Sequence, residues 1–326
     1  MHTQFLYWSQ QRGVMVTVYY GKALAAYGFG EGHPFGPDRL DAFWKYACQR
    51  KLDEQVHIAT PVSASKEEME YFHTQQYIEK LIRLSAEGTG TLDYGDTPAY
   101  PGIYESSLVV AGCVLDGARS ILSGITDRVF VPIAGLHHAR RNTAAGFCAV
   151  NDIGILIEEL KRNYGLQRIA YIDIDAHHGD GVFYEYEEDP DVYIADIHED
   201  GNYLYPGSGY ASETGSGNAT GSKLNLPLTP PNVQDKDFYI AWKEIEDFLS
   251  RVRPEFIILQ AGADSIYGDP ITDMALTPKA HSHATRQLCG IADVYCQGRL
   301  LVTGGGGYNR DNIARTWTAV VTAMLG

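Results

Sequence analysis

The segment YIDIDAHHGDG, residues 171–181, places five ionisable side chains directly after an apolar run. Side chains along a strand alternate between its two faces. Asp173 and Asp175 are therefore expected on the same side, joined by His177 if the chain stays extended. Two unpaired carboxylates would repel each other in a site of low dielectric. A divalent cation would relieve that repulsion, so the spacing indicates a metal site.

A distant carboxylate, Asp264, completes a plausible ligand set with Asp175 and His177. These three donors would bind Zn²⁺ and leave a coordination position for water, as catalytic sites do. Because most donors are oxygens, Fe²⁺ and Mn²⁺ are credible competitors. The adjacent histidines of GLHHAR, His137 and His138, could take a proton from that water, and a tyrosine hydroxyl could donate to the developing oxyanion. The predicted chemistry is metal-assisted hydrolysis of an amide or a similar carbonyl.

The elements that must position these residues follow an alternating pattern of apolar, strand-like runs and helical segments. This alternation predicts a parallel sheet covered by helices on both faces. In such sheets ligands gather beyond the carboxyl ends of the strands, and the clusters GLHHAR, DIDAHHGDG, GADS and GGGGYN each follow a predicted strand. The six predicted strands span residues 15–20, 128–135, 168–175, 191–198, 255–264 and 299–306.

Helical signals are clearest in three segments. A helix over 63–84 is predicted from the capping-box spacing of Ser65 and Glu68, and another over 277–295 from Thr277 as N-cap before a proline. The segment YIAWKEIEDFLSRV has the apolar period of a helix packed on a sheet.

Two further expectations concern residues near these helices. His281 and His283 lie two apart on a predicted helix, so they should face different directions and are expected at the surface. The Gly/Ser-rich segment 206–222 is expected to be a long surface loop near the site.

Composition limits the possible functions. The chain has 326 residues, 44% of them hydrophobic, which excludes a disordered chain or a small stapled scaffold. A net charge of -15 argues against nucleic-acid binding and favours a neutral or cationic partner. The five cysteines are scattered, and no apolar stretch is long enough to span a bilayer. We therefore expect a cytoplasmic protein with one catalytic domain, residues 15–326, preceded by a possible N-terminal extension, residues 1–14.

Eight motifs occur in a characteristic order between about residue 30 and residue 310: HPFGPDR (33–39), YFHTQQYI (71–78), GLHHAR (135–140), GFCAVND (146–152), YIDIDAHHGDG (171–181), YPGSG (205–209), QAGADSIYGDP (260–270) and GGGGYN (304–309). With them the chain resembles the zinc-dependent histone-deacetylase superfamily, particularly its bacterial acetoin-utilisation-type and acetylpolyamine-amidohydrolase-like members. The resemblance implies a single arginase/deacetylase-like α/β domain with a mostly parallel, eight-stranded sheet. It also implies that Asp175, His177 and Asp264 are the metal ligands, the same set that the residue types and spacing suggest.

For catalysis, the resemblance pairs His137 with Asp173 and His138 with Asp180. It makes His138 the proton shuttle and His137 mainly an electrostatic and hydrogen-bonding partner. It gives Tyr308 the role of polarising the substrate carbonyl. It also implies a structural monovalent cation, such as K⁺, held by backbone carbonyls near the metal ligands.

For substrate binding, the resemblance implies a narrow channel walled by Phe147, which follows Gly146, and by Tyr205. It places Asp96 on the rim of this channel, where it would hold substrate backbone or a cation. Tyr205 replaces the phenylalanine that is more usual there, which could add a polar contact. Ile271 is apolar where polyamine-selective relatives in animals carry an acidic gatekeeper, which weakens the case for a polyamine preference.

The expected substrate is an acetylated lysine in a protein or peptide, or a small acetylated amine. Two alternatives are a dinuclear manganese ureohydrolase of the arginase type and a non-catalytic acyl-lysine binding protein. The first is disfavoured because the D-A-H-x-D spacing of that class is absent here. The second is disfavoured because every catalytic position is filled. The oligomeric state is not readable from the sequence.

Overall fold

The central element of the computed structural model is a parallel sheet. The model describes residues 13–30 and 32–326, so most of the predicted N-terminal extension lies outside the described residues. The described residues form one sheet of eight parallel strands in the order β2-β1-β3-β8-β7-β4-β5-β6. The strands are β1 (Val16–Tyr19), β2 (His57–Ala59), β3 (Arg128–Val131), β4 (Ile169–Asp173), β5 (Val192–Glu199), β6 (Lys223–Leu228), β7 (Phe256–Gln260) and β8 (Leu300–Thr303).

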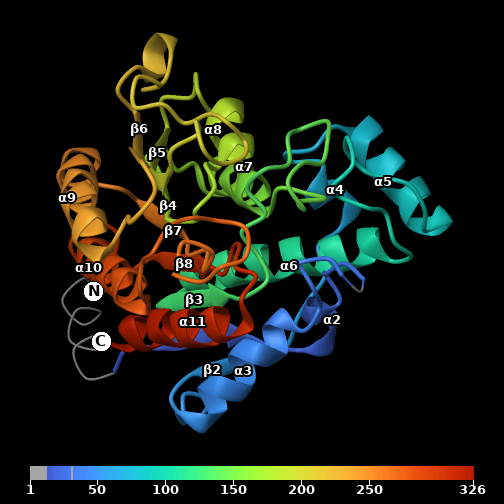
Figure 1. The fold of residues 1–326 in the computed structure, drawn as a ribbon, viewed down its shortest axis with the longest axis horizontal. Coiled ribbons are helices and arrows are strands. Elements are labelled where there is room, and N and C mark those ends of the chain that lie inside the picture. Colours follow the sequence, from blue (N-terminus) through green and yellow to red (C-terminus); the bar gives the residue numbers. More distant parts are fainter. Residues whose placement is uncertain (1–12, 31) are drawn as a thin grey trace, which may run out of the picture.

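Helices cover both faces of this sheet (Figure 1). Helices α9, α10, α11 and α3 pack side by side on one face, and α6 and α7 pack together on the other. Strands β3, β4 and β7 are buried along their whole length, which explains their almost continuous apolar sequences. The helices are α2 (Lys22–Ala25), α3 (Arg39–Gln49), α4 (Lys66–Met69), α5 (Gln75–Glu87), α6 (Ile103–Leu122), α7 (Asp152–Tyr164), α8 (Asp180–Glu185), α9 (Asp235–Val252), α10 (Pro278–Tyr295) and α11 (Arg310–Leu325), with a 3₁₀ turn η1 at Gly217–Ala219.

The predicted single α/β domain with an eight-stranded sheet is confirmed, and in the described residues the sheet is parallel throughout. All six strands predicted from the sequence are present. The individual patterns of β2 and β6 were not recognised because both are edge strands with weak apolar signals. Strand β2 has only three residues, and two of them are exposed.

The helix predicted over 63–84 is divided into α4 and α5. The capping box is present, since the Glu68 amide donates to Ser65 Oγ at 3.2 Å and the Ser65 amide to Glu68 Oε2 at 2.6 Å. Helix α4 nevertheless ends after one turn. The Thr74 amide donates to the carbonyl of Arg141 at 2.8 Å, and Thr74 then caps α5. A tertiary contact therefore overrides the local helical pattern.

Helix α10 begins as predicted, with Thr277 accepting a hydrogen bond from the Lys279 amide. The expected surface position of His281 is wrong: its side chain is fully buried, and its Nε2 lies 2.6 Å from the carbonyl oxygen of Gly262. The spacing predicts only that His281 and His283 face different directions. It does not reveal that the helix face carrying His281 packs against the segment after β7.

The segment between β5 and β6 is the predicted loop, interrupted only by η1. The hydroxyl of Ser208 in this loop lies 2.9 Å from Nδ1 of His178, the residue that follows His177 in the sequence. Within residues 13–30 and 32–326, none of the helices combines the length and apolarity required to cross a bilayer.

Candidate metal centre and active site

The candidate site lies at the carboxyl edge of four neighbouring strands. Strands β3, β8, β7 and β4 are adjacent in the sheet, and the predicted polar clusters follow them in turn. Because parallel strands end at the same edge, clusters that are distant in sequence converge there. The predicted convergence is therefore present.

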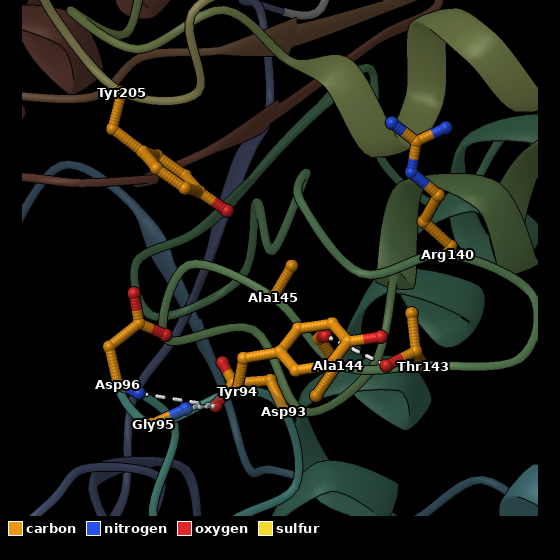
Figure 2. A pocket seen from close by; sticks show the side chains of 9 residues that line it. All are labelled: Asp93, Tyr94, Gly95, Asp96, Arg140, Thr143, Ala144, Ala145 and Tyr205. Carbon is orange, nitrogen blue, oxygen red and sulfur yellow. Dashed lines mark hydrogen bonds between the residues drawn. The ribbon is translucent and has the colours of Figure 1, made fainter.

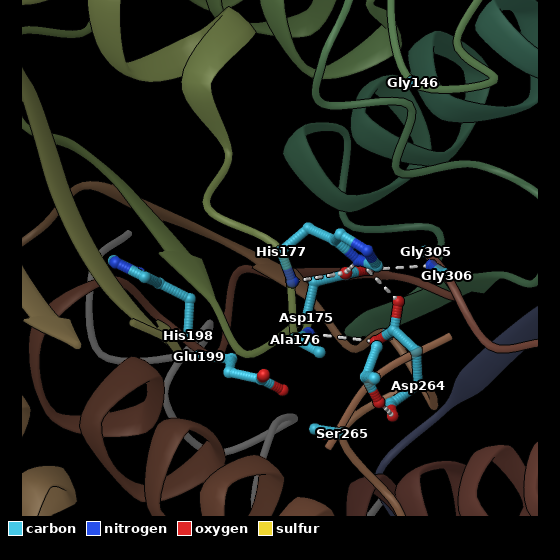
Figure 3. Close-up of polar contacts among 12 residues, drawn as sticks. Gly146, Asp175, Ala176, His177, His198, Glu199, Asp264, Ser265, Gly305 and Gly306 are labelled. Atoms are coloured by element: carbon cyan, nitrogen blue, oxygen red, sulfur yellow. Dashed lines mark hydrogen bonds and ion pairs between the residues drawn. The ribbon is translucent and has the colours of Figure 1, made fainter. Parts of the chain in front are cut away.

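Asp175, His177 and Asp264 form a buried group that fits a metal ion (Figure 3). Their candidate ligand atoms all lie within 4.8 Å of one another. His177 Nδ1 is 3.1 Å from Asp175 Oδ1 and 3.1 Å from Asp264 Oδ2. Two facing carboxylates and one imidazole are the donor set of an open divalent-cation site. It is the one group of at least three such residues found among the described residues.

Neighbouring groups fix the two carboxylates. Asp175 Oδ2 accepts hydrogen bonds from Gln260 Nε2 at 2.7 Å and from the Gly306 amide at 2.8 Å. Asp264 Oδ1 accepts from the Ala176 amide at 2.9 Å. Such outer contacts orient metal ligands before a metal arrives. Gln260 was not singled out from the sequence, although a glutamine that ends an otherwise apolar strand is a recognisable signal.

Without a cation, the electrostatic balance depends on protons. Burial lowers the pKa of His177, but the hydrogen bonds to Asp175 and Asp264 and the charges of these two carboxylates together outweigh burial and raise the pKa to about 10. Burial and the Asp175 charge raise the pKa of Asp264 to about 7. Both shifts reflect how strongly the buried carboxylates favour a positive charge beside them, which a divalent cation would supply.

Two histidine–aspartate pairs lie beside this group. His137 Nδ1 is 2.7 Å from Asp173 Oδ2, and His138 Nδ1 is 2.7 Å from Asp180 Oδ1. The two Nε2 atoms are 3.1 Å apart. The structure therefore contains both predicted pairings, and Arg140 adds a contact to Asp180 Oδ2 at 3.0 Å.

The two imidazoles have opposite tendencies. Burial lowers the pKa of His137, but the charges of Asp173, Asp175 and Asp196 and the hydrogen bond to Asp173 together outweigh burial and raise the pKa to about 9. Burial and the charge of His137 lower the pKa of His138 to about 4. Near neutral pH these shifts favour the charged form of His137 and the neutral form of His138.

Tyr308 lies at the end of the glycine run that follows β8. Its ring is half-buried, with its centroid 5.9 Å from that of Phe147. Its amide donates to Asp269 Oδ2 at 2.8 Å. A Cβ atom on Gly306 would lie 2.2 Å from Asp264 Oδ2, so only glycine lets this segment pass so close to the candidate ligands.

A second residue that the sequence reasoning did not single out is Arg39, at the end of the HPFGPDR motif. Its guanidinium is fully buried and donates to the carbonyls of Gly305 and Gly307 at 2.5 Å and 2.9 Å. It therefore supports the glycine run that leads to Tyr308. A charged residue in a Gly/Pro-rich segment gave no signal of burial.

Two of the predicted channel residues, Gly146 and Tyr205, lie next to the His138 ring. Gly146 has φ +53°, and a Cβ there would be 2.4 Å from His138 Cδ2, so this position requires glycine. The Phe147 amide donates to Thr97 Oγ1 at 3.1 Å. The Tyr205 ring centroid is 5.2 Å from that of His138.

A cavity of about 500 Å³ opens beside these residues, and we call it the rim cavity (Figure 2). Asp96 and Tyr205 line it, whereas the predicted channel residues Gly146 and Phe147 do not. Ile271 is not among its lining residues; it lies in the loop after β7, with its amide 3.2 Å from Asp269 Oδ1. The rim cavity is lined by Asp93, Tyr94, Gly95, Asp96, Arg140, Thr143, Ala144, Ala145 and Tyr205.

Fold and site together define an arginase/deacetylase-like α/β protein. Residues 33–324 match the family described as "Histone deacetylase domain", and the chain belongs to that family. It is 33% identical to the acetoin utilization protein AcuC of Bacillus subtilis over 317 residues, 94% of this chain and 81% of the relative. It is 34% identical to a probable deacetylase of Archaeoglobus fulgidus over 276 residues, 84% of this chain and 75% of the relative.

A solved structure, the HDA15 HD domain, has the same fold. The TM-score is 0.88 at 27% identity, covering 96% of this chain and 90% of the other. The predicted family membership is therefore confirmed.

Proposed function

We propose that this protein is a metal-dependent deacylase that hydrolyses an N-acyl amide, in the simplest case an acetyl amide, on a lysine side chain or a small amine. The observation that carries the proposal is the buried Asp175–His177–Asp264 group, with ligand atoms within 4.8 Å of one another, beside two aspartate-paired histidines. Membership of the histone deacetylase family supports hydrolysis of acetyl amides.

Asp175, His177 and Asp264 would hold the metal, with Zn²⁺ as the first candidate and Fe²⁺ or Mn²⁺ as competitors. A bound divalent cation supplies a Lewis acid for the amide carbonyl and acidifies a water molecule. Backbone carbonyls near these residues would hold a structural monovalent cation such as K⁺.

His138 takes the central proton-transfer role. Its neutral imidazole accepts a proton from the attacking water, and Asp180 holds the ring in place through Nδ1. Protonated His138 then gives that proton to the departing amine nitrogen. His137 stays charged beside Asp173 and stabilises negative charge that develops on the substrate.

Tyr308 donates its hydroxyl proton in a hydrogen bond to the substrate carbonyl oxygen. Burial raises the pKa of Tyr308 well above its ordinary value, which keeps the hydroxyl protonated. Phe147 and Tyr205 would flank the alkyl stem of the substrate, with Gly146 permitting the close approach to His138. Asp96 would contact the substrate at the rim, and Ile271 would contribute an uncharged wall.

The cellular setting that we propose is the cytoplasm. All five cysteines are free, and four of them are buried. Unpaired buried thiols are typical of a reducing compartment.

The direct test is a panel of acetyl-lysine peptides, longer acyl-lysines, acetylpolyamines and acetylated small amines, incubated with zinc-loaded protein. We expect hydrolysis of at least one acetyl amide, its loss with a chelator and its return with added metal. An Asp264→Ala variant should lose both bound metal and turnover. Binding without turnover in metal-replete protein would favour the acyl-lysine binding alternative, and two ions per chain would favour a ureohydrolase.

A further inference from the structure

We propose that Tyr27 is a positioning residue, whose buried hydroxyl holds Phe147 in a left-handed backbone conformation and thereby fixes the Phe147 ring against Tyr308. This inference rests on the proposed deacylase function, because Tyr308 is the side chain proposed to polarise the substrate carbonyl. Tyr27 follows α2 and lies 120 residues before Phe147, so the two meet only in the folded chain.

Phe147 occupies a position in a tight turn that bulky residues rarely adopt. Ala145 and Cys148 exchange two backbone hydrogen bonds, of 2.8 and 3.2 Å, across Gly146 and Phe147. Both central residues have positive φ, +53° and +66°. Two-residue turns of this kind favour asparagine, aspartate and glycine, because other side chains are strained at positive φ. The conformation of Phe147 therefore needs support from elsewhere in the fold.

Phe147 also differs from the other residues with positive φ. In the described part of the chain, five residues other than glycine have positive φ, and Phe147 is the one that is not exposed. The other four are Lys51, Asn232, Arg253 and Gln297. At Phe147 the strained backbone directs a half-buried aromatic ring, so the strain has a consequence for packing.

Side chains from two distant segments hold the backbone of Phe147. Its amide donates to Thr97 Oγ1 at 3.1 Å, and its carbonyl accepts from the Tyr27 hydroxyl at 2.8 Å. The same hydroxyl accepts from the Ala149 amide at 2.8 Å. Tyr27 is fully buried, and its hydroxyl uses both its proton and a lone pair on this segment. Tyr27 therefore fixes the two peptide groups that follow Phe147.

The fixed backbone determines where the Phe147 ring lies. The ring centroid is 5.9 Å from that of Tyr308, with an angle of 82° between the ring planes. It is also 4.6 Å from the centroid of the His33 ring, at 77°. Edge-to-face contacts of this kind are individually weak, so they do not hold a strained backbone by themselves. Without the Tyr27 hydroxyl, the ring should leave its position beside Tyr308.

A double-mutant cycle tests whether Tyr27 acts through the Phe147 ring. We would measure kcat/KM for the zinc-loaded wild type, Tyr27→Phe, Phe147→Ala and the double variant, with the best acetyl amide of the substrate panel. Tyr27→Phe should lower kcat/KM about tenfold when Phe147 is present and less than about twofold when it is alanine, because the ring to be positioned is then absent. Equal factors in both backgrounds would overturn the proposal.

Tyr77→Phe is the matched control for Tyr27→Phe. Tyr77 is also buried, and its hydroxyl donates to the Ala149 carbonyl at 2.5 Å, two residues beyond Phe147. Tyr77→Phe should lower Tm about as much as Tyr27→Phe, yet keep kcat/KM within about twofold of the wild-type value. If Tyr77→Phe loses as much kcat/KM as Tyr27→Phe, general loosening of the segment explains the effect and the positioning role is wrong.

Crystal structures of the wild type and both variants separate this proposal from the deacylase function, because they require no turnover. In Tyr27→Phe we expect the Phe147 ring to move away from Tyr308 or to occupy more than one position. In Tyr77→Phe it should keep the wild-type position. A Phe147 ring that stays in place in Tyr27→Phe would contradict the role of Tyr27. Failure of the wild-type protein to hydrolyse any acyl amide would instead overturn the proposed function.

Discussion

At the residue scale, His137 and His138 show how environment divides two identical side chains into different roles. Each has an aspartate on Nδ1, at 2.7 Å in both cases. Asp173 is fully buried, so its charge acts strongly on His137, whereas Asp180 shares its charge with Arg140. His138 also feels the positive charge of His137, which lowers its pKa. The family resemblance predicts the pairs, but the difference in charge depends on burial that only the folded chain defines.

Tyr308 gives the prediction at this scale. Tyr308→Phe should reduce kcat by about 10²–10³-fold, because one hydrogen-bond donor to the developing oxyanion is lost. Metal content should not change, since Tyr308 is not one of the three candidate ligands. Steady-state kinetics and elemental analysis of the same preparation check both points. Full activity in the variant would refute the assigned role.

At the element scale, the strands with long apolar runs were predictable, and the edge strands were not. Strand β6 begins with a buried lysine and contains a proline, a pattern that does not indicate a strand. Similarly, the division between α4 and α5 depends on the contact of Thr74 with Arg141, which lies far along the chain. Local patterns predict elements that bury an apolar face. They fail where a polar tertiary contact determines the local structure.

Lys223 at the start of β6 gives an element-scale prediction. Its side chain is buried, with 2% of the residue exposed, and Nζ donates to the carbonyls of Val192 and Asp189 at 2.6 and 3.1 Å and to Ser222 Oγ at 2.7 Å. Lys223→Met would remove three hydrogen bonds to this ammonium from buried acceptors, at a cost of about 2–4 kcal/mol in the free energy of unfolding.

Urea denaturation measures this loss. Lys243→Met, at an exposed position of α9, is the matched control and should change stability by less than about 0.5 kcal/mol. If the two variants are equally stable, the buried ammonium does not hold β6 against the start of β5.

At the scale of the whole molecule, the order of the strands converts distant sequence clusters into one site. Asp175 and Asp264 are far apart in sequence, yet β4 and β7 are neighbours with Asp173 aligned to Gln260. The polar residues at strand ends were therefore sufficient to predict the candidate metal group. The rim cavity was not predictable in the same way, because it is formed by loops whose meeting depends on Asp93, Thr97 and Phe147.

The same convergence predicts that metal binding and global stability are linked. Asp175 and Asp264 come from separate segments, so the unfolded chain has no comparable site, and a metal that binds only the folded state must stabilise it. At a metal concentration about 100 times the Kd, the gain is about 2.7 kcal/mol, which should raise Tm by several degrees. A chelator should reverse the rise.

Two variants serve as controls for this prediction. Asp264→Ala should show little or no shift of Tm with metal, whereas Tyr308→Phe should keep the wild-type shift, because only the first removes a candidate ligand. A wild-type Tm that does not respond to Zn²⁺, Fe²⁺ or Mn²⁺ would mean that these three side chains do not form a metal centre.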